Sequence, residues 1–137
     1  INCNASYLYP SFKAGWIPDT PSNRNEILRR LNNWTAMCDS DPTRGVTEAI
    51  TRYTDNKKRI AIWIMGDDLA NNLYDDPVEG IRRVASKFNK IDDNGIPFIR
   101  IHGMAFPNNA TFYPVEFQNM LRVLASENYG AVVVESY

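Results

Sequence analysis

The sequence predicts an α/β fold with a doubly wound, mostly parallel sheet that carries helices on both faces. Three short apolar runs, Ile60–Met65, Pro97–Met104 and Ala131–Val134, have the length and composition of strands. Amphipathic helical patterns separate these runs, and this order is typical of parallel βαβ units. The 137 residues, 44% of them hydrophobic, suit one domain over 1–137 with one core.

The N-terminal part begins with a predicted strand over Ile1–Tyr9 and a turn-rich segment over Pro10–Pro21. Ser22 is a good N-cap for a helix that runs to about Met37. One face of this helix is apolar, with Ile27, Leu28, Leu31 and Trp34 at helical spacing. The turn residues Asp39-Ser40-Asp41-Pro42 end it, and a second helix follows. The apolar side of that helix carries Val46, Ala49, Ile50 and Tyr53.

Ile60–Met65 is apolar at every position, which predicts a strand buried on both faces. Gly66-Asp67-Asp68 ends this strand. A helix is then expected from Pro77, which suits a first helical turn, to about Ile91. The turn residues Asp92 to Gly95 precede the strand Pro97–Met104, and the chain closes with a helix over Val115–Asn128 and the strand Ala131–Val134.

The charge balance limits the classes of partner. Fifteen basic residues against 16 acidic ones provide no basic surface for nucleic acid. No apolar run approaches the ~20 residues of a membrane-spanning helix. Ile1–Tyr9 has no signal-peptide pattern, which favours the cytoplasm over secretion. Cys3 and Cys38 are either two buried thiols or one disulfide.

Ser40 and Asp67 carry side-chain oxygen atoms, and each lies just after the end of a predicted helix or strand. In parallel α/β sheets, ligands bind at the carboxyl ends of the strands, where Ser40 and Asp67 are expected. A hydroxyl and a carboxylate are suitable ligands for Mg²⁺. The alternative is that Ser40 belongs to a helix N-cap cluster and Asp67 only terminates a strand.

A different class of function would use Asp67, Asp68 and His102, the only histidine. These residues would serve a small α/β hydrolase or a phosphoryl-transfer enzyme. No G-x-S-x-G, Walker or G-x-G-x-x-G motif accompanies them. His102 is equally compatible with a packing contact in the sheet.

The order of motifs resembles a von Willebrand factor A domain, the integrin-I-type binding fold. Thr20-Pro21-Ser22-Asn23-Arg24 and Ser40-Asp41-Pro42 resemble the segment leading to a metal loop of that family. The strand ending in Gly66-Asp67-Asp68, the strand ending in His102-Gly103-Met104, and the segment Leu121 to Val133 resemble its later strands and closing pattern. The resemblance covers about residues 20 to 134.

The resemblance implies a Rossmann-like protein-binding or scaffolding module and not an enzyme. A partner carboxylate would complete the coordination of Mg²⁺, with Ser40 binding directly and Asp67 directly or through water. The family's Asp-x-Ser-x-Ser loop and the central strand before it are absent. The chain is therefore expected to be the C-terminal part of such a domain, with an incomplete metal site.

The absent strand would pair with Ile60–Met65. Each unsatisfied buried backbone group costs about 1–3 kcal/mol, whereas a whole domain is stable by only ~5–15 kcal/mol. We therefore expect no stable monomer unless something fills this place in the sheet. An upstream segment, a second chain, another copy of this chain or Ile1–Tyr9 could fill it.

Overall fold

The structure is a computed structural model in which the chain divides into two compact units, 1–38 and 39–137. Each unit is described by itself. The described residues are 5–13, 15–35, 41–55, 57–69, 76–107 and 113–135. Cys3, Cys38 and Ser40 lie outside them. None of the helices in these ranges is long and apolar enough to cross a bilayer.

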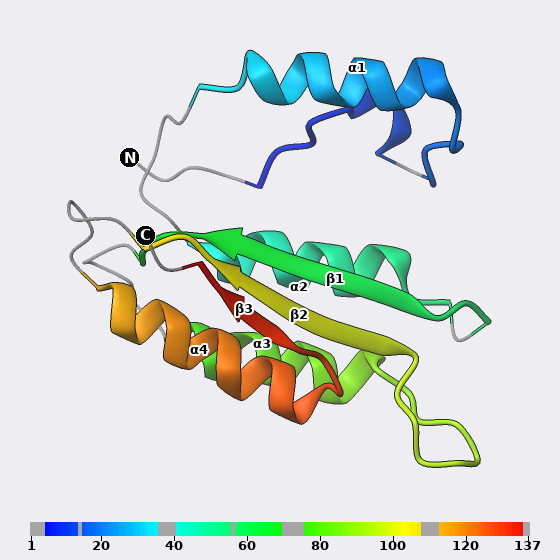
Figure 1. The fold of residues 1–137 in the computed structure, drawn as a ribbon. Coiled ribbons are helices and arrows are strands. Elements are labelled where there is room, and N and C mark those ends of the chain that lie inside the picture. The colour runs from blue at the N-terminus through cyan, green and yellow to red at the C-terminus, as the bar shows by residue number, and fades with distance from the viewer. Residues whose placement is uncertain are drawn as a thin grey trace. The chain divides into compact units, whose positions relative to one another are not determined.

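The first unit contains the 3-10 helix η1 (Pro10–Phe12) and the helix α1 (Pro21–Asn32) (Figure 1). The cap of α1 is Thr20 and not Ser22, because the Thr20 hydroxyl accepts the Asn23 N–H at 3.2 Å. Pro21 takes the first helical position, where a missing N–H costs nothing. The helix ends at Asn32 and is shorter than the predicted helix.

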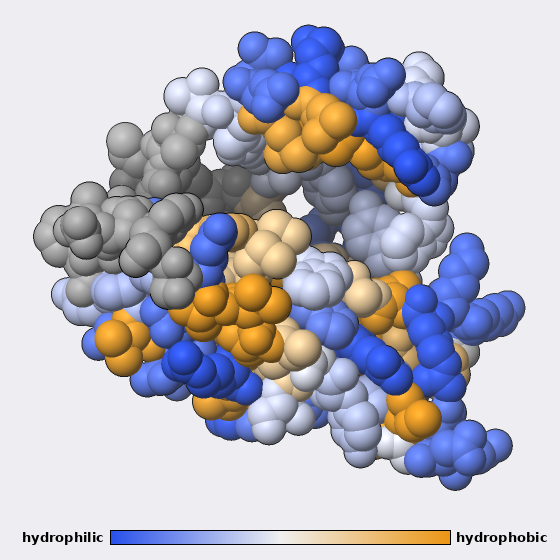
Figure 2. Space-filling view, viewed as in Figure 1, coloured by the Kyte–Doolittle hydropathy of each residue, from blue (hydrophilic) through white to orange (hydrophobic). Residues whose placement is uncertain are grey.

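No residue of α1 is buried. More than half of the surface is exposed for Leu28 and Leu31 in the helix, and also for Trp34, which follows it. An apolar patch is visible over this helix in Figure 2.

The prediction of a strand over Ile1–Tyr9 is wrong for residues 5–9, which are irregular. This segment contacts the Arg30 side chain of α1. Arg30 Nη1 donates to the Leu8 carbonyl at 3.1 Å, and the Arg30 guanidinium lies 4.4 Å from the centroid of the Tyr9 ring. The Arg30 side chain thus donates to the carbonyl of Leu8, which in a sheet would accept a hydrogen bond from a neighbouring strand.

The second unit alternates helices and strands and confirms the predicted α/β class with a parallel sheet. Asp41 and Asp76 cap its first two helices through their carboxylates. The elements in order are α2 (Pro42–Tyr53), β1 (Ile60–Gly66), α3 (Pro77–Phe88), β2 (Ile99–Ala105), α4 (Pro114–Glu127) and β3 (Val132–Val134).

The sheet has the order β1-β2-β3, and both pairs are parallel. The register places Ile60 beside Ile99 and Gly103 beside Val132. Both crossovers move in the same direction along the sheet. Because such crossovers are right-handed, α3 and α4 lie on the same face. The described helices α2, α3 and α4 form one layer in Figure 1. The described strand order has no reversal, so the two crossover helices α3 and α4 do not lie on opposite faces in this unit.

The strands are buried on one face only, against this helix layer. Along β1, Ile64 is buried, whereas Trp63 and Met65 are 46% and 60% exposed. The expectation that this strand is buried on both faces is therefore corrected. Helix α4 packs closely against β2 at Gly103. A Cβ added at this glycine would lie only 2.8 Å from the Leu121 Cβ. The largest side chains of the core are Ile50, Ile81, Ile99, Ile101, Leu121 and Leu124.

Candidate functional site

Asp67 and Asp68 directly follow the carboxyl end of β1, as predicted. Asp68 Oδ1 accepts the backbone N–H of Leu69 at 2.8 Å and that of Tyr113 at 2.6 Å. Tyr113 is the N-cap residue of α4. The Asp68 carboxylate therefore ties the loop after β1 to the start of α4, which is a structural role.

The predicted magnesium site would use Ser40 and Asp67 at this edge of the sheet. Mg²⁺ requires about six oxygen ligands in near-octahedral geometry. In the described ranges, no three His, Cys, Asp or Glu side chains gather closely enough to hold a metal ion. Asp68 is engaged with backbone N–H groups, and Ser40 lies outside the description. The pairing of Ser40 with Asp67 stays a prediction.

His102 lies in the middle of β2 and not near its end. Its register partner is Trp63, four residues before Asp67. At ~3.3 Å per residue, this separates His102 from the position of Asp67 by about 13 Å along the sheet. The structure does not assemble the hydrolase constellation of Asp67, Asp68 and His102.

The His102 ring has two structural contacts. It stacks on Trp63 with a centroid distance of 4.5 Å and an interplanar angle of 15°. Its Nδ1 accepts the Ala131 N–H at 3.1 Å, so the neutral ring carries its proton on Nε2. His102 thereby anchors the chain just before β3, which supports the packing alternative.

The backbone groups on one side of β1 have no partner strand among the described residues. The Ile60 N–H donates to Phe98 O at 2.9 Å, and Gly66 O accepts the Phe106 N–H at 2.8 Å. In a parallel pair, alternate residues give both their backbone groups to the same neighbour. The residues that point away from β2 are Ala61, Trp63 and Met65. The described strands end at β1 on this side, so these groups lie on a sheet edge.

The residues of this edge strand carry no charge and no proline, two features that usually protect an edge against pairing. Natural edge strands carry charges, proline or bulges that prevent the addition of another strand. Residues Ile60–Gly66 include neither a charge nor a proline. Lys57, Lys58 and Arg59 precede the strand, and Asp67 and Asp68 follow it. The strand is thus a seven-residue apolar edge between a basic and an acidic end.

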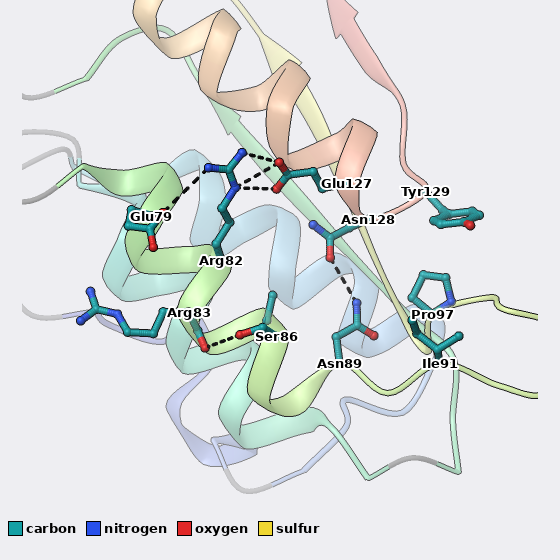
Figure 3. Close-up of a pocket in the computed structure, with 11 residues that line it drawn as sticks. Glu79, Arg82, Arg83, Ser86, Asn89, Ile91, Pro97, Glu127, Asn128 and Tyr129 are labelled. Carbon is teal, nitrogen blue, oxygen red and sulfur yellow. Dashed lines mark hydrogen bonds and ion pairs between the residues drawn. The ribbon is translucent and has the colours of Figure 1, made fainter.

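A hollow of about 530 Å³ lies between the C-terminal parts of α3 and α4 (Figure 3). Arg82 Nε donates to the Glu127 carboxylate at 2.8 Å. Hydrogen bonding to Arg82 lowers the pKa of Glu127, and the same bond raises the pKa of Arg82. Asn89 Nδ2 donates to Asn128 Oδ1 at 3.2 Å. The polar groups of this wall pair with one another, which indicates a structural seam.

This seam was not predicted from the sequence. Asn89 and Asn128 each directly follow a helix, at its C-cap. The sequence signal for them is an asparagine after the last apolar position of a helical pattern.

Comparisons with models of known protein families, with curated proteins and with solved structures find no match to this chain. The resemblance to the von Willebrand factor A domain therefore rests on the quoted motifs alone. The candidate site that the described residues support best is the edge of β1.

Proposed function

We propose that this chain is a protein-binding module that accepts an extended segment of a partner along the edge of β1. The observation that carries the proposal is the set of outward N–H and C=O groups of Ala61, Trp63 and Met65, which no described strand pairs. The resemblance to a family of binding modules supports the same class of function.

The chemistry of the edge selects the kind of partner. Alternate donors and acceptors along β1 match the backbone of another strand, which supplies main-chain hydrogen bonds. The side chains beside these groups, Trp63 and Met65, are exposed and apolar. An extended segment with apolar side chains at alternate positions satisfies both features.

The proposal includes no metal step, because in the described ranges no three His, Cys, Asp or Glu side chains gather closely enough to hold a metal ion. A Mg²⁺ ion held by Ser40 and Asp67 stays an expectation from the resemblance. The observation that favours the edge is structural, whereas no described arrangement favours the enzyme alternative.

The test is selection from a displayed library of random peptides on the immobilised chain. Ala61→Pro removes one outward N–H without breaking a bond to β2. Ala61→Thr keeps that N–H and is the matched control. We expect wild type and Ala61→Thr to enrich apolar, extended peptides, and Ala61→Pro to lose them. Equal enrichment of such peptides on Ala61→Pro and on wild type would contradict the proposal.

A further inference from the structure

We infer that the strand accepted by β1 is β1 of a second copy of this chain, in a two-fold antiparallel dimer centred on Trp63. The inference rests on the proposed function, because it uses the same edge, and it names the partner. Three features of the described residues support it: the backbone pattern of β1, the charges at its ends and the symmetry of the pairing.

The backbone pattern matches self-pairing. An antiparallel pair centred on Trp63 places Trp63 opposite Trp63 of the second copy, and Ala61 opposite Met65. These are the residues whose N–H and C=O groups point away from β2. Each opposed pair exchanges two hydrogen bonds, so about six bonds join the copies. The full length of Ile60–Gly66 is then paired.

The charges at the two ends of β1 select the orientation and the register. With Trp63 on the two-fold axis, Arg59 faces Asp67 of the second copy, and Lys58 faces Asp68. By symmetry, these pairs of opposite charge lie at both ends of the paired β1 strands. A parallel pairing would instead oppose basic residues to basic ones. A shift of two residues, the smallest that keeps the outward groups paired, leaves at most one charge pair at each end.

The symmetry closes the assembly. A two-fold axis perpendicular to the sheet keeps the helix layers of both copies on one face. The exposed Trp63 side chains then lie side by side on the other face. The pairing consumes the β1 edge of both copies, and β3, at the opposite edge, has only three residues. A closed dimer is therefore expected instead of a filament.

The first test is sedimentation velocity of the full 137-residue chain over a range of concentrations. We expect a reversible dimer and a melting temperature that rises with protein concentration. Ala61→Pro is expected to give a monomer, whereas Ala61→Thr dimerises as wild type does. Far-ultraviolet circular dichroism of each variant checks that the fold is retained.

The second test reverses charge. Arg59→Glu opposes two acids at each end, and Asp67→Lys opposes two bases. Each variant alone is expected to associate about tenfold more weakly or worse. An equimolar mixture restores the dimer, because Glu at 59 then faces Lys at 67. Arg83→Glu makes the same charge change at an exposed position of α3. It is the control and is expected to leave the dimer intact. Recovery on mixing excludes misfolding, which matters because Arg59 also bonds Asp92.

A chain that is monomeric at every concentration, or a dimer that Ala61→Pro and the charge reversals leave unchanged, would overturn the inference. A monomer that still selects peptides in an Ala61-dependent way overturns the inference but leaves the proposed function standing. Loss of both the dimer and the Ala61-dependent peptides overturns both.

Discussion

Replacement of Asn89 by alanine is expected to lower the free energy of unfolding by about 2–4 kcal/mol. Asn89 Oδ1 accepts the Ile99 N–H at 2.9 Å, and Nδ2 donates to Ile99 O at 2.9 Å. These groups of Ile99 face the side of β2 where β3 would pair, but β3 pairs only from Gly103 onward. Asn89 thus replaces a missing strand at the start of β2.

The magnitude follows from the two backbone groups. Ile99 is 1% exposed, and each of its groups that loses its partner costs about 1–3 kcal/mol. Asn128 Oδ1 also loses a donor, while water in the adjacent hollow reduces the sum.

Urea unfolding followed by circular dichroism measures the change, with the slope m compared between variants. Ser86→Ala is the matched control in the same hollow, because the Ser86 hydroxyl only donates to the exposed turn of its own helix, at Arg83 O. Its effect should stay within about 0.5 kcal/mol. If Asn89→Ala is as mild as this control, the side chain does not replace a strand partner, and the reasoning is refuted.

Three further outcomes are expected. Gly130→Ala should lower the melting temperature strongly, because the new Cβ would lie 1.7 Å from Ile101 O; an unchanged melt contradicts this. The hydrogen bond from the Ile96 N–H lowers the pKa of Asp92 from its ordinary value of 3.8, so the ionised Asp92 stabilises the fold above pH 3.8 and this contribution is lost as the pH falls further. Asp92→Asn should therefore be less stable than wild type at neutral pH, and the two should become equally stable in acid. Millimolar Mg²⁺ should bind weakly by calorimetry, whereas turnover of phosphate or carboxylic esters that Asp67→Asn abolishes would support the enzyme alternative.

Local patterns were sufficient to predict most elements of the second unit. The apolar run Ile60–Met65 and the helical spacing after Pro77 depend on neighbours in sequence, and both elements form where expected. The face that each strand buries depends on strand order, which no local pattern contains. A run that is apolar at every position fits one covered face as well as two, so the exposure of Trp63 and Met65 could not be predicted.

The candidate site was predictable only in part, because it depends on register. Asp67 follows β1 as the turn residues indicate, but its separation from His102 follows from the pairing of Ile60 with Ile99. The seam through Asn89 depends on the shortness of β3. The predicted strand is wrong for residues 5–9 because a strand needs a partner strand, and here the Arg30 side chain donates to the Leu8 carbonyl instead.

Amide hydrogen exchange along β1, measured as a function of protein concentration, tests the central claim most directly. We predict that protection of the Ala61, Trp63 and Met65 amides rises with concentration more steeply than protection of the alternate amides, which bond β2. This period-two pattern is expected because only the outward amides gain partners from a second chain. Outward amides whose protection does not change with concentration, whether they are protected or exposed throughout, would contradict an edge that accepts a strand.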